Sequence, residues 1–199
     1  MFIQVIQGKS SHPDEIRAKT DQWQEQHGPQ APGWLGGTYG FTPDGTFVAV
    51  VRFESRDAAQ ANSEQPEQGE WWSEMEALFD GPVSFRDYDE VTTLFDGGSD
   101  EAGFVQVMHG QVGQPQAMRD LMAGSADVLR AARPDIIGAT IGISPDGSYT
   151  QTTAFTDEEA ARRGEQQELP AEARARFEEA QIEVAEYLDL PQPWFASQG

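Results

Sequence analysis

The chain has 199 residues and a formal net charge of −21, so its surface repels phosphate groups, which argues against nucleic acid or an anionic membrane as a partner. It contains no cysteine, which excludes disulfides, thiolate catalysis and cysteine-based zinc sites. No signal peptide or bilayer-spanning run is visible, and we expect a soluble cytoplasmic protein.

The chain repeats itself at a constant interval of 102 residues, as from Phe2 to Phe104. The segment Phe-Ile-Gln-Val at 2–5 returns as Phe-Val-Gln-Val at 104–107, and Thr-Pro-Asp-Gly at 42–45 returns as Ser-Pro-Asp-Gly at 144–147. One offset kept over most of each half indicates two copies of one folding unit. We therefore expect a first repeat at 1–95, a polar linker at 96–103 and a second repeat at 104–199.

Each repeat is predicted to run strand, helix, strand, strand, helix, strand. The Pro-Asp-Gly turns favour a hairpin between the second and third strands, because Gly supplies the left-handed residue that such a turn requires. Ile16, Thr20, Trp23 and His27 fall on one helical face, which marks the first helix. The strands expected in the first half are 2–8, 34–41, 46–53 and 83–88, and the helices are 13–27 and a region from 57 to 79 that Pro66 breaks. The second half has strands at 104–110, 136–143, 148–155 and 184–190, a helix at 115–132, and a second helix interrupted near Pro170 that resumes at 171–180.

This order of elements makes an antiparallel sheet with both helices on one face. The fold class expected is α+β, with two ferredoxin-like βαββαβ repeats. Strand 46–53 is apolar on both sides at its centre, which calls for cover on both faces. We therefore expect the two sheets to pack together as an intrachain, pseudo-dimeric α/β barrel. A monomer satisfies this arrangement, and a further dimer of the tandem chain is the alternative.

With this order of elements, the chain resembles the dimeric α/β-barrel superfamily, and within it the antibiotic-biosynthesis-monooxygenase-like (ABM-like) group. The resemblance covers 2–88 and 104–190 and rests on the element order, the Pro-Asp-Gly hairpin, the Phe that ends the third strand (Phe53 and Phe155) and the tryptophan-rich second helix. It implies a pocket between sheet and helices that holds an aromatic compound and oxygenates it without a bound cofactor. Other members of the superfamily degrade haem or resemble peroxidases, and fold alone does not decide among them.

The resemblance implies a site in the first half made of Asn62, Trp71, Trp72 and Arg86. In that role Asn62 donates to a developing oxyanion, the tryptophans stack on an aromatic ring, and Arg86 neutralises a phenolate or carboxylate. The alternatives are core packing for the tryptophans and a surface ion pair for Arg86. The equivalent positions of the second half hold Gly164, Ala173, Arg174 and Leu188, so a pocket of this type belongs to the first half.

The second half has polar residues of its own on a strand that the fold should cover. Gln151 and Thr153 replace Ala49 and Val51, and with Tyr149 they predict either a polar ligand-binding cavity or a wet edge strand. His109 is either a base or axial haem ligand of that site or a structural histidine. Gln4 and Gln106 are matched amides that we interpret as pairing across the sheet interface.

No spacing of His, Asp and Glu recommends a metal site, and no phosphate-binding glycine pattern is present. The leading hypothesis is a cofactor-independent monooxygenase-like protein that acts on a small aromatic or polycyclic compound. The alternatives are a non-catalytic, small-molecule-binding or stress-related protein on the same scaffold, and a haem-binding or haem-degrading protein that uses His109.

Overall fold

The computed structural model describes residues 1–98, 100–124, 126–168 and 171–197. The chain forms two compact units, one made of Met1–Asp89 with Pro193–Gly199 and the other of Glu90–Gln192. This division differs from the predicted one at 95/96, because residues 90–95 belong to the second unit and the chain's end belongs to the first. The predicted linker begins as a short 3₁₀ turn, Phe95–Gly97, and Ser99 within it lies outside the described residues.

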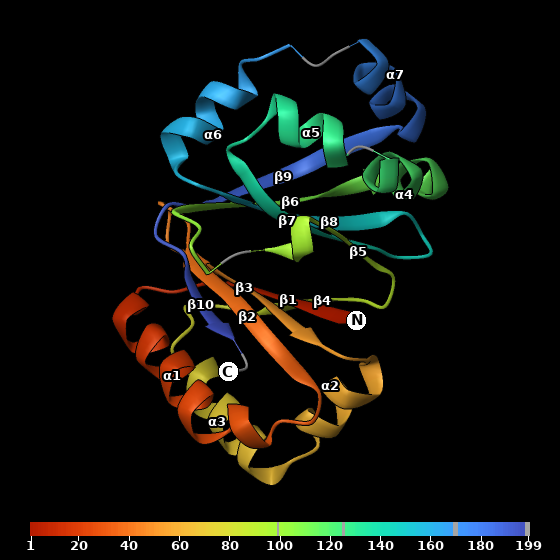
Figure 1. The fold of residues 1–199 in the computed structure, drawn as a ribbon. Helices are drawn as coiled ribbons and strands as arrows, with labels where there is room; N and C mark the ends of the chain where they lie inside the picture. The colour runs from red at the N-terminus through yellow and green to blue at the C-terminus, as the bar shows by residue number, and fades with distance from the viewer. Residues whose placement is uncertain (99, 125, 169–170, 198–199) are drawn as a thin grey trace. The chain divides into compact units, whose positions relative to one another are not determined.

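The first unit is one antiparallel sheet with helices on one face (Figure 1). Its sheet has the strand order β10-β2-β3-β1-β4. A buried cluster on the helix side includes Ile16, Trp23, Phe47 and Met75 and holds the layers together. The elements are β1 (Phe2–Lys9), α1 (Pro13–Gln26), β2 (Trp34–Phe41), β3 (Thr46–Phe53), α2 (Arg56–Ser63), α3 (Pro66–Glu76), β4 (Ser84–Tyr88) and β10 (Trp194–Ser197), with a 3₁₀ turn at Gly28–Gln30 after α1.

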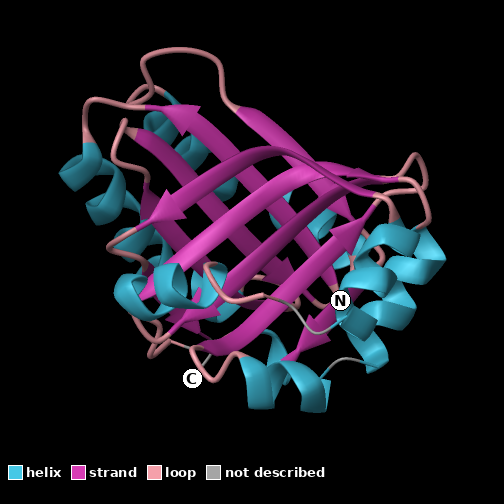
Figure 2. Cartoon of the chain, turned by 90° about the horizontal axis from the view of Figure 1, so that it is seen from above, coloured by secondary structure: helices cyan, strands magenta, loops and turns pink. Residues whose placement is uncertain are grey.

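The second unit repeats this plan with the order β5-β7-β8-β6-β9. Its helix-side core is centred on buried Met118, Leu121, Ile141 and Tyr149. The helix predicted at 115–132 is two helices here, and residue 125 between them lies outside the described residues, as does Pro170. The elements are β5 (Val91–Leu94), β6 (Phe104–Val112), α4 (Pro115–Gly124), α5 (Ala126–Ala132), β7 (Ile136–Ile143), β8 (Ser148–Phe155), α6 (Glu158–Glu165), α7 (Ala171–Ala180) and β9 (Ile182–Leu190). Figure 2 shows the twisted strands of the sheets and the helices beside them.

Each sheet takes one edge strand from the other sequence repeat. After β4 completes its place in the first sheet, β5 pairs with β7 in the second, and Thr93 lies opposite Thr140. At the other end of the chain, β10 leaves β9 and pairs with β2, and Phe195 lies opposite Thr38. The two pairings are equivalent under the 102-residue offset. The sequence did not predict either strand, because each is only four residues long.

The bulge in each sheet explains a repeated glycine. The β2–β3 register shifts between Trp34 and Gly36, and the equivalent shift lies between Ile136 and Gly138. Gly36 has φ +140°, and a Cβ there would approach the backbone oxygen of Ala196 to 2.6 Å. Gly138 is equally close to the backbone nitrogen of Gly98, at 2.5 Å. Both glycines therefore make room for the neighbouring chain.

Local signals also repeat. The predicted hairpins form, with Gly45 at φ +82° and Gly147 at φ +85°. Ser55 caps α2 by accepting from the Ala58 amide, and Asp157, 102 residues later, caps α6 by accepting from Ala160. The α+β class and its two ferredoxin-like repeats are thus confirmed. None of the helices within the described part of the chain is long and apolar enough to cross a membrane.

Candidate functional site

The first unit holds a cavity of about 270 Å³ between its sheet and its helices. The floor comes from β1, β2 and β3, and the walls come from α1, α2, α3 and β4. Most of its lining is aromatic or aliphatic, with a few neutral polar groups among them. The lining side chains used below are Gln4, Thr20, Trp23, Tyr39, Phe47, Asn62, Trp71, Trp72 and Phe85.

Asn62 is the best-placed polar group of this cavity. It lies on α2, its exposed fraction is 6%, and it lines the cavity. Its backbone oxygen accepts from Gln65, but its side-chain amide has no hydrogen-bond partner among the described residues. The amide atoms are not fully buried and face the open space of the cavity, where water or a ligand can hydrogen-bond to them. This amide is therefore available to a bound molecule.

Trp71 and Trp72 lie side by side on α3, but they are held differently. Trp71 donates from Nε1 to the backbone oxygen of Lys19 at 3.1 Å and packs against Trp23 with ring centroids 6.3 Å apart. Trp72 meets the ring of Phe85 edge to face at 5.2 Å. Phe85 is 48% exposed. Trp71 is thus a fixed wall, whereas Trp72 and Phe85 form an aromatic rim that a ring compound can contact.

No acidic, basic or histidine side chain of the described residues lines this cavity. Its titratable group is Tyr39, whose pKa burial raises well above its ordinary value, so the phenol stays protonated at neutral pH. The structure does not bring Arg86 to the other three predicted residues. Arg86 lies opposite Val5 in the β1–β4 register, and its Nη1 donates to Gln7 Oε1 at 2.8 Å. Because neighbouring side chains alternate across a strand, Phe85 faces the cavity and Arg86 faces away.

The second unit has a larger cavity, of about 650 Å³, in the equivalent place. Tyr149, Gln151 and Thr153, the polar residues predicted from β8, all line it. Gln106 of β6 and Tyr187 of β9 also line it, as do the apolar side chains of Leu94, Met108, Met122, Leu129, Ile136, Ala139, Phe155, Phe177, Ile182 and Val184. The structure therefore has a cavity in each unit, although only the first contains the asparagine and tryptophan set.

His109 is not part of this second cavity. It pairs with Thr150 in the β6–β8 register, and its Nδ1 lies 2.6 Å from Thr150 Oγ1. Met108 and Gln151, one position along, face the cavity, so alternation turns His109 to the other face of the sheet. Its exposed fraction is 6%. These observations favour the structural reading of His109 over that of a base or haem ligand in this cavity.

The matched glutamines also differ from the interpretation that they pair across the sheet interface. Both line the cavity of their own unit. Gln4 donates to Asp87 Oδ1 and Gln106 donates to Asp189 Oδ1, each at 2.9 Å. These aspartates lie on the neighbouring strand and are themselves 102 residues apart.

Two rim residues were missed by the sequence reasoning. Phe85 and Tyr187, 48% and 59% exposed, each line the cavity of their unit. They occupy equivalent positions at the 102-residue offset, opposite Ile6 and Met108. The sequence signal for them is that both repeats have an aromatic residue at this position of the last strand, although the strand is otherwise only weakly apolar. Among the described residues, no group of three or more His, Asp and Glu side chains is placed to hold a metal ion.

No protein-family model and no curated protein sequence matches the chain. Solved structures do share its fold. A candidate monooxygenase from Lactobacillus acidophilus NCFM has a TM-score of 0.71 at 12% identity, over 100% of this chain and 96% of that one. Another from Fusobacterium nucleatum subsp. nucleatum ATCC 25586 has a TM-score of 0.74 at 8% identity, over 100% and 94%. An anthrone oxidase-like protein has a TM-score of 0.66 at 11% identity, over 99% and 91%.

Two antiparallel sheets, each carrying helices and a cavity on one face, define an α+β protein of two ferredoxin-like repeats. More particularly, the chain shares its fold, over almost its whole length, with these two candidate monooxygenases and the anthrone oxidase-like protein.

Proposed function

We propose that the first-unit cavity binds a small, planar aromatic compound and promotes its oxygenation by O₂ without a bound cofactor. The observation that carries the proposal is Asn62, a buried amide that has no partner among the described residues and faces a cavity walled by tryptophans. Its volume of about 270 Å³ is near the lower end of ligand pockets, which favours a compact fused-ring compound. The fold shared with two candidate monooxygenases and an anthrone oxidase-like protein supports the same reaction class.

The lining restricts the chemistry. Because no carboxylate or histidine of the described residues lines the cavity and Tyr39 stays protonated, a strong general base is not provided. The compound must therefore be acidic itself, as a phenol or a ketone that tautomerises to one is. The Asn62 amide donates to the resulting oxyanion, and no charged side chain is needed for that contact.

The overall reaction proposed converts a ring methylene to a carbonyl. The ionised substrate supplies the electrons, one oxygen atom of O₂ becomes the carbonyl oxygen, and the other leaves as water with the two methylene hydrogens. The protein contributes a fixed orientation, a dry aromatic surround and the amide donor. Trp72 and Phe85 present their rings at the rim, where a flat compound can lie against them.

Anthrone is a suitable probe, because it has such a methylene and tautomerises to a phenol. Oxygen uptake and anthraquinone formation measure turnover, and tryptophan fluorescence measures binding, since all five tryptophans belong to the first unit. We expect turnover above the rate in buffer and a loss of ~100-fold in Asn62→Ala with binding retained. Gln60→Ala, an exposed change on the same helix, is the matched control. Turnover equal to that in buffer, or unaffected by Asn62→Ala, would refute the proposal. Quenching without turnover would favour the non-catalytic binding protein instead.

A further inference from the structure

The part of the second-unit cavity floor that β8 supplies is polar, whereas the part of the first-unit floor that β3 supplies is apolar. Under the 102-residue offset Thr153 replaces Val51, Gln151 replaces Ala49, and Tyr149 replaces Phe47. All six of these side chains line the cavity of their own unit. The second cavity therefore differs from the first in kind: its polar groups are gathered on one surface, and its volume is larger.

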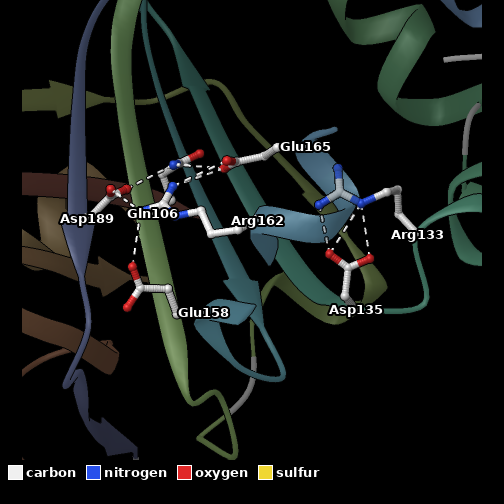
Figure 3. Close-up of polar contacts among 7 residues, drawn as sticks. All are labelled: Gln106, Arg133, Asp135, Glu158, Arg162, Glu165 and Asp189. Atoms are coloured by element: carbon white, nitrogen blue, oxygen red, sulfur yellow. Dashed lines mark hydrogen bonds and ion pairs between the residues drawn. The ribbon is translucent and has the colours of Figure 1, made fainter. Parts of the chain in front are cut away.

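The polar atoms of this floor are only partly used within the protein. Gln106 is 6% exposed, and its Nε2 donates to Asp189 Oδ1 at 2.9 Å and to Glu165 Oε1 at 3.3 Å. Both amide hydrogens are thus occupied, while its carbonyl oxygen accepts from no described residue. Figure 3 shows this amide between the two carboxylates.

Thr153 lies opposite Gln106 in the β6–β8 register and is 3% exposed. Its Oγ1 accepts from Gln151 Nε2 at 3.0 Å, and no described residue accepts its hydroxyl hydrogen. Tyr149, 2% exposed, also makes no side-chain hydrogen bond to a described residue, and burial raises its pKa to about 12, so it remains a donor. The floor therefore offers donors beside an acceptor that are open to the cavity and unused by the described residues, so that water or a ligand can pair with them.

The charges around the cavity are already paired. Arg133 makes a two-pronged ion pair with Asp135, with distances of 2.7 and 3.0 Å (Figure 3). Glu165 pairs with Arg162 at 3.3 Å in addition to accepting from Gln106. Of the remaining lining residues, Arg174 and Glu178 contribute one charge of each sign. A strongly charged ligand would have no net counter-charge here, so a neutral ligand fits better.

The walls above this floor are largely hydrocarbon, and Tyr187 adds an exposed aromatic ring at the rim. We propose that the second unit binds a neutral, multi-ring compound that carries hydroxyl or carbonyl groups along one edge. The oxygen-bearing edge lies on Gln106, Gln151 and Thr153, and the hydrocarbon body lies against the apolar walls. This binding does not depend on the reaction proposed for the first unit, because the two cavities share no residue.

Two probes with one ring skeleton test the proposal: a hydroxylated flavanone, naringenin, kept neutral at mildly acidic pH, and unsubstituted flavanone. Affinities are measured by saturation-transfer NMR titration on the whole chain. We expect naringenin to bind more tightly than flavanone. We expect Thr153→Val to weaken naringenin by about fivefold, the value of one hydrogen bond, while flavanone changes by less than about twofold. Thr153→Ser, which keeps the hydroxyl, should restore the preference, and the exposed change Glu159→Gln should leave it unchanged.

The measured quantity is the ratio of the two affinities, which a general loss of structure would not shift. The proposal is overturned if neither probe binds, if both bind equally to the wild type, or if Thr153→Val weakens both by the same factor. Preference for naringenin that Thr153→Val abolishes and Thr153→Ser restores supports it.

Discussion

Gln4 donates from Nε2 to Oδ1 of Asp87 at 2.9 Å, on the cavity side of the first sheet. The second unit repeats this bond between Gln106 and Asp189 at the same distance. An arginine completes each pair, but it comes from different positions: Arg56 begins α2, whereas Arg162 lies in the middle of α6. The two units thus repeat the same amide–carboxylate contact, with an arginine from a different helix position in each.

Removing that carboxylate should destabilise the second unit. Asp189→Asn takes away a charged acceptor from both Gln106 and Arg162, and we expect a loss of about 1–3 kcal/mol in the free energy of unfolding. Urea unfolding followed by circular dichroism measures it. Glu158→Gln breaks only an exposed pair with Arg162 and should cost less than about 1 kcal/mol. Equal effects of the two substitutions would show that the buried amide contact is unimportant.

Substitution of Trp71 should mainly lower stability, whereas substitution of Trp72 should mainly lower ligand affinity. Trp71→Phe loses the bond to the Lys19 carbonyl and should lower stability by about 1 kcal/mol. Trp72→Phe loses no hydrogen bond within the described residues, so it should change stability by less than that. Affinity for anthrone should fall more in Trp72→Phe than in Trp71→Phe. Thermal unfolding and fluorescence titration measure the two effects, and the reverse ranking would contradict the assignment of wall and rim.

The C-terminal strand should stabilise the first unit. Trp194 stacks on Tyr39 with ring centroids 5.9 Å apart, and its Nε1 donates to Thr20 Oγ1 at 3.1 Å. Trp194→Ala should cost about 3 kcal/mol and also weaken anthrone binding, because Thr20 and Tyr39 line the cavity. Gln192→Ala, an exposed change just before the strand, is the control. Stability unchanged in Trp194→Ala would mean that β10 does not pair as described.

Alkaline pH should weaken the second unit through Tyr149. Burial raises its pKa to about 12 from an ordinary 10.0, so the folded state favours the protonated phenol. That stability is fully present below pH 10 and falls as pH rises toward 12, by about 2 kcal/mol at pH 12. Tyr149→Phe should remove this part of the pH dependence and one late-titrating tyrosine from the ultraviolet difference spectrum. Identical pH profiles for the variant and the wild type would contradict it.

The repeat predicted most of the fold, because a constant offset transfers each local signal from one half to the other. Residue chemistry within a few positions is enough to predict the Pro-Asp-Gly hairpins, the helix boundary at Pro66 and the buried face of the first helix. The edge strands β5 and β10 could not be predicted in this way. Each has four residues and is stabilised by a partner strand far away in the sequence.

The sequence predicted six of the residues that line the two cavities, but not the direction of two strand residues. Asn62, Trp71 and Trp72 reach the first cavity, and Tyr149, Gln151 and Thr153 reach the second. Arg86 and His109 lie on strands, where neighbouring side chains point to opposite faces of the sheet. An error of one residue in the assumed alternation therefore moves the side chain from the cavity face to the other face. The sequence established no neighbour's direction on these strands, because Phe85 gave no clear signal of its direction and Gln106 was interpreted as facing the sheet interface.

Because the two repeats exchange edge strands, the stability of each half depends on a segment of the other. A break at the midpoint of the gene would leave each fragment without its own border strand, and it would deprive the first of the indole that Trp194 inserts beside Tyr39. Each unit therefore needs a segment of the other repeat to complete its sheet, whatever ligand its own cavity takes.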